Sequence, residues 1–512
     1  MKTVIITGSA GLVGSESAYF FHKKGFRVIG IDNDFRKYFF GKTGSTKWKT
    51  QEIKKKLKNY IHYSLDIRNK NLLEKIFFRY RKDAKLIIHA AAQPSHDWAA
   101  REPLTDFSIN ATGTLNLLEL FRKYLSKEVF IYVSTNKVYG DKPNELPLKE
   151  KDTRFEINKK NKFFKGIDES MSIDQSIHSL FGVSKCSADL LTQEYGRNFK
   201  LQTGVFRLGC ITGPAHSGAE LHGFLNYLVK ANLYKIPYTI FGYKGKQVRD
   251  NIHAYDLVNC FWHFFKNPKK GAMYNIGGGR KNSCSVIEAI SIIENISKIK
   301  MLKKYNKKNR VGDHIWYISS NSKFKKDYKS WDVKYSLKNI LKDIISNTNV
   351  IKPSEILDKL REGVINTLHV SNSGTQFKDG MDITLCCINF DTLELQYAAA
   401  YNPLCIVRDG ELIIYNANKF PIGAFIGEKE NFDNITIQLQ KNDQLYIYSD
   451  GYADQFGGPN GKKFMVGNFR KLLVQLANKP ITEQMGFLKT TLDNWQGDLE
   501  QVDDVLIIGL KV

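Results

Sequence analysis

The sequence of 512 residues has no run of about 18 apolar residues, so it predicts no membrane-spanning helix. Its start, "MKTVIITGSAGLVG", passes from a short apolar strand into glycines and lacks the features of a secretion signal. No C-x-x-C pair occurs among the seven cysteines, which are scattered except for the neighbours Cys386 and Cys387. An odd, unpatterned set of cysteines predicts reduced thiols in a cytoplasmic protein.

No internal repeat and no low-complexity linker interrupts the chain, although its length exceeds that of one ordinary domain. The charge, however, is unevenly distributed. Residues 1–343 hold 61 Lys and Arg against 31 Asp and Glu, whereas residues 344–512 hold 15 against 21. This break in composition predicts a junction near residue 344.

Apolar strand patterns alternate with helical patterns in the first part of the chain. The strand patterns are "TVIITG", "RVIGID", "KLIIHAAA" and "VFIYVST", and helical patterns such as "SESAYFFHKKG" and "NATGTLNLLELFRKYL" lie between them. This spacing predicts an α/β fold with a Rossmann-type, doubly wound parallel sheet. We expect a nucleotide-binding core mainly in residues 1–206 and a smaller substrate-binding lobe mainly in 207–343, with a closing helix at 335–345.

The pattern changes after residue 346. One amphipathic helical pattern ends near residue 368, and short strand patterns with turn signals follow: "MDITLCCINF", "TLELQYAAA", "PLCIVRDGELIIYNA", "NITIQLQ" and "QLYIYSD". One further helical pattern, "GNFRKLLVQLAN", precedes a last strand, "DDVLIIGLKV". These features predict a second domain over 346–512 that contains an antiparallel sheet.

Three glycines, Gly8, Gly11 and Gly14, lie between the first strand and the first helix. Glycines there permit a tight turn and the close approach of a pyrophosphate, and the helix N-terminus adds the positive end of its dipole. Asp32 ends the second strand, where a carboxylate can bind the adenosine ribose hydroxyls and disfavours a 2′-phosphate. The pattern therefore predicts NAD rather than NADP.

With these motifs, residues 1–343 resemble the NAD-dependent epimerase/dehydratase family of extended short-chain dehydrogenases, which act on nucleotide sugars. "STNKVYGD" (134–141), "GKQVRDNIHAYD" (245–256), "NIGGG" (275–279) and "NRVGDHIWYIS" (309–319) are most similar to the CDP-paratose 2-epimerases. The resemblance implies further NAD-site residues near the adenine, near the nicotinamide and on the central helix: Asp66, Ile67, Ala90, Ala91, Ala92, Asn110 and Lys185.

The resemblance implies a reversible oxidation at C2 of the sugar through a 2-keto intermediate. Ser134 and Thr135 would form hydrogen bonds with the sugar hydroxyl, and Lys185 would bind the nicotinamide ribose. The implied substrate-binding residues are Asn136, Arg249, Asn275 and Arg310. The two arginines among them are candidates for bidentate contacts with the CDP pyrophosphate.

Phe181, in "HSLFGVSK", departs from the family pattern, which places a tyrosine four residues before the lysine. Phenylalanine has no proton to exchange, and general acid–base help is worth about 10²–10⁴-fold in rate. His178, Tyr139, Thr135 or a water could replace it, and Cys210 could also lie near the substrate. The alternative to a working epimerase is a non-catalytic module that binds NAD and a nucleotide sugar.

Residues 346–512 resemble the later half of the sporulation-type, metal-dependent serine/threonine phosphatases, through "YIYSDGYADQFGG" (446–458) and "EQVDDVLIIGLKV" (500–512). The resemblance implies Mn²⁺ or Mg²⁺ ligands at Asp450 and Asp503, with Asp504 as an alternative. The earlier half of that family has no counterpart in residues 320–380. We expect a partial domain with an exposed sheet edge, and a phosphatase is the third functional reading.

The expected partners follow from charge and from the family resemblance. The excess of basic residues fits solvated lysines spread over the surface and would also attract an anionic nucleotide sugar; nucleic acid is the least favoured partner. The resemblance implies a homodimer formed through two long helices, one of which would contain "CSADLLTQEYGRNF" (186–199).

Overall fold

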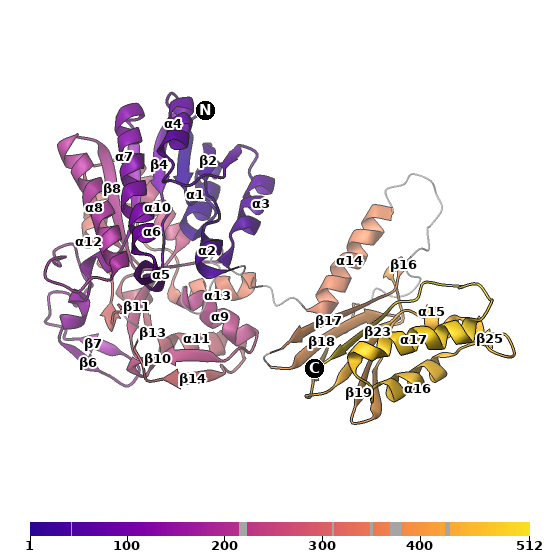
Figure 1. Ribbon diagram of the computed structural model, residues 1–512. Helices are drawn as coiled ribbons and strands as arrows, with labels where there is room; N and C mark the ends of the chain where they lie inside the picture. Colours follow the sequence, from indigo (N-terminus) through magenta and orange to yellow (C-terminus); the bar gives the residue numbers. More distant parts are fainter. Residues whose placement is uncertain are drawn as a thin grey trace. The chain divides into compact units, whose positions relative to one another are not determined.

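The computed structural model describes residues 1–41, 44–214, 223–309, 312–348, 352–368, 380–390, 392–424 and 431–512. The chain forms two compact units, Met1–Asn349 and Val350–Val512 (Figure 1). Within the described ranges, every buried hydrophobic cluster draws its residues from one unit only. No helix in these ranges is long and apolar enough to span a bilayer.

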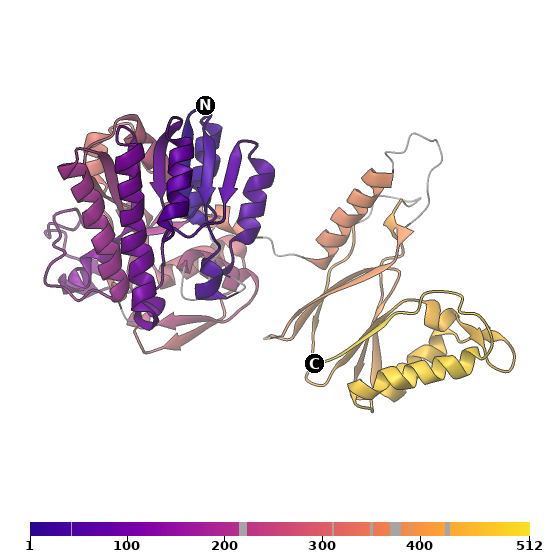
Figure 2. The ribbon, with the colours of Figure 1, turned by 45° about the horizontal axis from the view of Figure 1, so that its top comes forward.

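A seven-stranded parallel sheet lies at the centre of the first unit, in the order β12-β8-β5-β4-β1-β2-β3 (Figure 2). Most of its strands are runs of buried apolar residues because helices cover both faces. The doubly wound fold predicted from the sequence is thereby confirmed. The strands are β1 (Thr3–Thr7), β2 (Arg27–Ile31), β3 (Tyr60–Tyr63), β4 (Ala84–His89), β5 (Val129–Thr135), β8 (Gln202–Leu208) and β12 (Ala272–Ile276).

Successive residues of β1 point to opposite faces of the sheet and enter different cores. Val4 and Ile6 lie in a cluster with residues of α1 (Leu12–Lys23) and α10 (Ala254–Lys266). Ile5 lies in a second cluster with residues of α4 (Lys70–Tyr80), α7 (Gly113–Tyr124) and α8 (Leu180–Asn198). The other helical segments of this region are α2 (Arg36–Phe40), α3 (Lys47–Lys56), α5 (His96–Arg101), α6 (Pro103–Phe107) and a π-helical turn at Ser108–Thr112.

A smaller lobe follows β8 and contains its own core. Three helices contribute to this core: α9 (Phe224–Leu233), α11 (Val286–Ser297) and α13 (Leu337–Asn347). The helix expected at 335–345 is α13. The chain returns from this lobe to the parallel sheet in α10 and β12, so the two lobes interleave in sequence. The further elements are β6 (Leu148–Glu150), β7 (Phe155–Ile157), β9 (Cys210–Thr212), α9 (Phe224–Leu233), β10 (Tyr238–Phe241), β11 (Val248–His253), β13 (Ser283–Ser285), α11 (Val286–Ser297), β14 (Lys303–Asn306), β15 (Trp316–Tyr317), α12 (Ser322–Asp327) and α13 (Leu337–Asn347).

The second unit contains two main antiparallel sheets, β17-β18-β22 and β20-β19-β23-β26. Its main strands are β17 (Ile383–Asn389), β18 (Glu394–Ala400), β19 (Leu404–Arg408), β20 (Glu411–Tyr415), β22 (Ile435–Gln438), β23 (Gln444–Tyr448) and β26 (Ile507–Lys511). Four two-residue strands form two further pairs: β16 (Gly380–Met381) with β21 (Ile422–Gly423), and β24 (Phe456–Gly457) with β25 (Lys462–Lys463). Its helices are α14 (Pro353–Leu368), α15 (Gly451–Asp454), α16 (Val466–Leu476) and α17 (Ile481–Gln496).

The sequence patterns of the second unit miss two of these helices, the four-residue α15 and the longer α17. Only Gln484 and Leu488 are buried along α17, so it lacks the broad apolar stripe that marks a helix in a sequence.

Candidate active site

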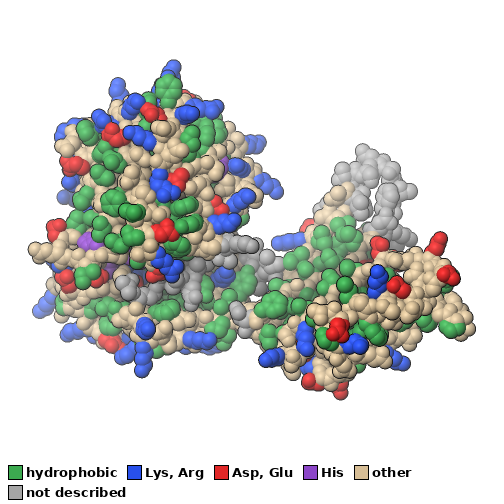
Figure 3. All heavy atoms as spheres, viewed as in Figure 1, with side chains coloured by type: hydrophobic (Ala, Val, Ile, Leu, Met, Phe, Trp, Pro, Cys, Tyr) green, Lys and Arg blue, Asp and Glu red, His purple; other side chains and the backbone are tan. Residues whose placement is uncertain are grey.

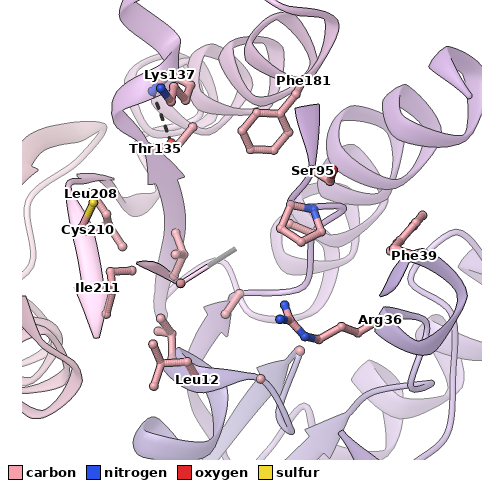
Figure 4. A pocket seen from close by; sticks show the side chains of 18 of the residues that line it. Leu12, Arg36, Phe39, Ser95, Thr135, Lys137, Phe181, Leu208, Cys210 and Ile211 are labelled. Carbon is pink, nitrogen blue, oxygen red and sulfur yellow. Dashed lines mark hydrogen bonds between the residues drawn. The ribbon is translucent and has the colours of Figure 1, made fainter. Parts of the chain in front are cut away.

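A cavity of about 820 Å³ lies where the central strands of the parallel sheet end (Figure 4). Its lining includes Gly8 after β1, Asp32 after β2, Ala90 after β4 and Thr135 at the end of β5, together with Arg249 from β11. Open α/β sheets bind ligands at the carboxyl ends of their strands, and the volume is that of a small-molecule site.

The glycine turn after β1 has no space for side chains. Gly8 has φ +68°, and a Cβ on it would lie 2.7 Å from the Ala91 nitrogen. A Cβ on Gly14 would lie 2.0 Å from the Gly8 carbonyl oxygen, whereas one on Gly11 would make only a 3.4 Å contact with the same oxygen. These glycines let β1, the segment after β4 and the start of α1 approach closely, so the backbone and the helix dipole face the cavity.

Two carboxylates flank the next part of the cavity. Asp32 accepts hydrogen bonds from the backbone nitrogens of Ala10 (3.0 Å) and Asp34 (2.9 Å); burial raises its pKa, and these bonds oppose that shift. Burial alone would raise the pKa of Asp66, but the bidentate hydrogen bonds from Arg68 outweigh this effect, and the resulting pKa is lower than usual. Ile67 is buried beside Gly113. Asp32, Asp66 and Ile67 all line the cavity.

Lys185 reaches the cavity from α8. Its Nζ donates to the Val133 carbonyl oxygen at 2.9 Å and lies 4.4 Å from the centre of the Tyr132 ring. Burial lowers the pKa of Lys185 to about 7, against the opposing charges of Asp189 and Asp106. A group with this pKa can change its charge near neutral pH.

Ser134 and Thr135 end β5 with different hydrogen bonds. The Ser134 hydroxyl donates to Asp189 at 2.6 Å, and the Arg207 guanidinium holds the same carboxylate with bonds of 3.0 and 2.9 Å. Because its one proton is engaged, Ser134 can only accept from a ligand. Thr135 accepts from the Lys137 nitrogen (3.3 Å) and donates to Asn136 (3.4 Å), and all three residues line the cavity.

Phe181 lies in the cavity wall and is only 7% exposed (Figure 4). Its ring makes an edge-to-face contact with His96, with centroids 4.9 Å apart. His96 also lines the cavity, as do Asp97, Lys137 and Cys210. No sequence pattern singled out His96; its only signal was its position four residues after Ala92, which the family resemblance puts near the nicotinamide.

Asn110 and Asn275 lie outside the set of described residues that line the cavity. Asn110 accepts from the Gln93 nitrogen at 2.9 Å and donates to Asp106 at 3.0 Å and Ser184 at 3.1 Å. Asn275 accepts from the Tyr139 hydroxyl at 2.8 Å and donates to the Ile167 carbonyl oxygen at 3.0 Å. In this structure both asparagines are buried and hold protein segments together, and a direct contact of either with a ligand stays a prediction.

Two of the expected acid/base substitutes are also absent from the lining. Tyr139 is fully buried between Asn275 and Arg207. The two ring nitrogens of His178 face the carbonyl oxygens of Ser176 (3.1 Å) and Val138 (2.9 Å). Of the candidates named from the sequence, Thr135 and Cys210 reach the cavity among the described residues.

The two arginines expected at the substrate pyrophosphate differ in what the structure describes. Arg249 lines the cavity, forms an ion pair with Asp313 and donates to the Val248 carbonyl oxygen at 2.8 Å. A phosphate group would therefore compete with Asp313 for this guanidinium. Arg310 lies outside the described residues.

The metal site expected in the second unit is not supported. Nowhere in the described part of the chain do three or more His, Cys, Asp or Glu side chains gather as they would around an ion. Asp450 lies at the start of α15, near Asp382, whose pKa is raised by burial and then by Asp450. Asp503 accepts a hydrogen bond from the Asp504 nitrogen at 2.7 Å. A pair of carboxylates is fewer than the ligands that Mn²⁺ or Mg²⁺ needs for a two-metal centre.

Comparison with known proteins places this site in a family. Residues 4–277 match the model of the NAD-dependent epimerase/dehydratase family, and residues 333–512 match that of Stage II sporulation protein E (SpoIIE). The CDP-paratose 2-epimerase of Salmonella typhi is 36% identical over 307 residues, which are 58% of this chain and 85% of that protein.

Solved structures agree with the sequence matches. The UDP-glucuronic acid 4-epimerase of Bacillus cereus, in complex with UDP-glucuronic acid and NAD, is 25% identical with a TM-score of 0.55, covering 68% of this chain and 98% of that one. The UDP-glucose 4-epimerase of Thermotoga maritima, solved with UDP-glucose, is 25% identical with a TM-score of 0.54, covering 67% and 98%. Since the first family model spans more than half of the sequence, the chain belongs to the NAD-dependent epimerase/dehydratase family.

Proposed function

We propose that the first unit binds NAD and epimerises a CDP-linked sugar at C2. The observation that carries this proposal is the convergence of the glycine turn, Asp32 and Lys185 on one cavity of the family fold. The turn leaves room for a pyrophosphate, Asp32 suits a ribose, and Lys185 lines the same cavity beside β5, so the donor set fits NAD. The 36% identical relative is named a CDP-paratose 2-epimerase, which supports the choice of base and carbon.

The proposed mechanism divides the work between cofactor and chain. When bound, NAD accepts a hydride from the sugar carbon and returns it to the other face. The chain would hold the reacting parts: the amides at the start of α1 face a pyrophosphate, Asp32 the adenosine ribose and Lys185 the nicotinamide ribose. Thr135 would contact the reacting hydroxyl with Ser134 as an acceptor, and Arg249, Arg310 and Asn136 would hold the nucleotide-sugar substrate.

The test combines cofactor analysis with sugar NMR. We expect the purified full-length chain to retain NAD, and to convert CDP-paratose into its C2 epimer with a changed H1–H2 coupling. The UDP analogue of the sugar is the matched comparison, because it changes only the base. Retained NAD with an unchanged CDP-sugar would contradict epimerisation while leaving binding intact.

Phe181 favours a second candidate, a module that binds NAD and a nucleotide sugar without turnover. The two candidates predict different responses to Phe181→Tyr. For a non-catalytic module, the wild type should show no measurable rate. The restored phenol should then produce turnover, because acid–base help is worth about 10²–10⁴-fold. For a working epimerase, the wild type already converts the sugar. Single-turnover assays of both proteins distinguish these outcomes.

We also propose that the first unit forms a homodimer through α6, α7 and α8, in which α6 and α7 each pack against α8. Apolar side chains are exposed along these helices, and Leu104 of α6 is 87% exposed. Figure 3 shows hydrophobic side chains over the face where Figure 1 labels the three helices. The patch comprises Leu104, Phe107, Leu115, Leu180, Val183 and Leu190. An apolar patch of this kind marks a protein–protein contact, and a self-complementary face fits a two-fold dimer.

Charges placed on this face should separate the subunits. We expect Leu104→Glu/Leu190→Glu to sediment as a monomer at a concentration at which the wild type is dimeric, because the dimer would bury unpaired carboxylates. Leu302→Glu is the matched control, since Leu302 is exposed but lies in the smaller lobe. A wild type that sediments as a monomer, or a double variant that remains a dimer, would contradict the proposed interface.

A further inference from the structure

His96 stands beside the one position where this chain lacks the expected proton donor. It is the first residue of α5, and its ring packs edge-to-face against Phe181 with centroids 4.9 Å apart. Both side chains belong to the cavity lining, together with Thr135 and Lys185. An imidazole thus lies next to the position where a tyrosine hydroxyl would otherwise act.

A hydroxyl orients this imidazole. The Nδ1 atom of His96 lies 2.7 Å from the Oγ atom of Ser179, which also accepts a hydrogen bond from the Gly182 nitrogen at 3.1 Å. The remaining lone pair of Ser179 can accept from Nδ1–H, which leaves Nε2 as a base. When Nε2 takes up a proton, the resulting imidazolium still donates from Nδ1–H to the same oxygen. The hydroxyl can therefore hold the ring in both states that a reversible proton transfer requires.

The backbone at Gly312 lies directly against the His96 ring. Gly312 has φ +71°, and a Cβ on it would lie 3.2 Å from Nδ1 and 3.4 Å from Cε1 of His96. Lys137 fixes this segment by donating to the Gly312 carbonyl oxygen at 2.7 Å. The charged groups among the neighbouring lining residues are Asp97, Lys137 and Asp313.

We propose that His96 is the acid/base for the reacting sugar hydroxyl, in place of the phenol that Phe181 lacks. This inference rests on the proposed epimerisation. As the hydride leaves the carbon and the C=O bond forms, the hydroxyl O–H bond breaks and its proton moves to Nε2. When the hydride returns to the opposite face, Nε2 gives the proton back to the oxygen. Protons and electrons balance over the cycle.

The first experiment exchanges one proton carrier for another. We expect His96→Gln to retain NAD and to convert the CDP-sugar about 10²–10⁴-fold more slowly, because glutamine keeps a polar side chain but exchanges no proton. Adding Phe181→Tyr to this variant should restore most of the lost rate. His178→Gln is the matched control, since it removes a histidine outside the lining and should leave the rate close to that of the wild type.

The second experiment observes the ring without relying on turnover. In protein labelled with ¹³C-histidine, the signal that disappears in His96→Gln identifies His96. We expect this signal to shift on addition of the CDP-sugar to NAD-loaded protein, and the His178 signal to stay in place. A converting wild type whose His96→Gln variant keeps its rate, or whose His96 signal does not respond, would overturn the role of His96 and leave epimerisation standing. A wild type that retains NAD and converts nothing would overturn both.

Discussion

Replacing Asp189 with alanine should lower the free energy of unfolding of the first unit by about 3–5 kcal/mol, because it leaves the Arg207 charge buried without its partner. Asp189 is fully buried and Arg207 is 3% exposed. The same substitution removes the acceptors of Ser134 and Gln193. Urea unfolding followed by tryptophan fluorescence measures the loss, since five of the six tryptophans lie in the first unit.

Two further variants test whether the buried charge is the cause. Asp189→Ala/Arg207→Met removes both charges and should recover much of the stability, because breaking a buried pair costs more than replacing it by apolar groups. Glu128→Ala breaks the more exposed pair with Lys85 and should cost no more than about 1 kcal/mol. An Asp189→Ala protein as stable as the Glu128→Ala protein would contradict the explanation.

Replacing Gly14 with alanine should destabilise the first unit even before any ligand is added. The new Cβ would lie 2.0 Å from the Gly8 carbonyl oxygen and 2.8 Å from the Ser9 Cα, and this turn of the backbone has little room to move. Overpacking typically costs about 1–3 kcal/mol, and we expect the upper end of that range. NAD retention should be lost as well, because the turn that faces the pyrophosphate must change shape. Unfolding of NAD-free protein and cofactor analysis measure the two effects.

Gly11→Ala is the matched variant in the same turn. Its Cβ would make only a 3.4 Å contact with the Gly8 oxygen, and its backbone, with φ −71°, suits alanine. We expect NAD-free stability to stay close to that of the wild type, while NAD binding weakens because the added methyl group faces the pyrophosphate position. Equal stability losses in both variants would show that the distances around Gly14 do not govern the turn.

The parallel sheet was predictable because its strands carry their own signal. β1 and β5 are short runs of buried residues followed by loops, and such runs separated by helical patterns allow few folds. The glycine turn was readable for the same reason, since its constraints act between residues close in sequence. Helix α17 was not predictable from the sequence, because only two of its residues are buried and most of its side chains are exposed.

The chemistry of the candidate site was less predictable than its location. Ser134 meets Asp189 and Arg207 only because β5, α8 and β8 are neighbours in space, and no spacing in the sequence announces that triad of side chains. His96 likewise meets Phe181, 85 positions later in the chain, where α5 contacts α8. Sequence patterns identified the strands and loops that supply such groups, but the pairing of their side chains depends on packing.

The separate cores of the two units have a consequence for synthesis. The last helix of the first unit, α13, contributes Leu337, Ile340, Leu341 and Ile344 to a cluster whose other buried members all precede it. When this helix has been synthesised, the 163 residues from Val350 onward are still to come. At about 5–20 residues per second their synthesis takes roughly 8–30 s, so the first unit can complete its core and fold while the second unit is still being made.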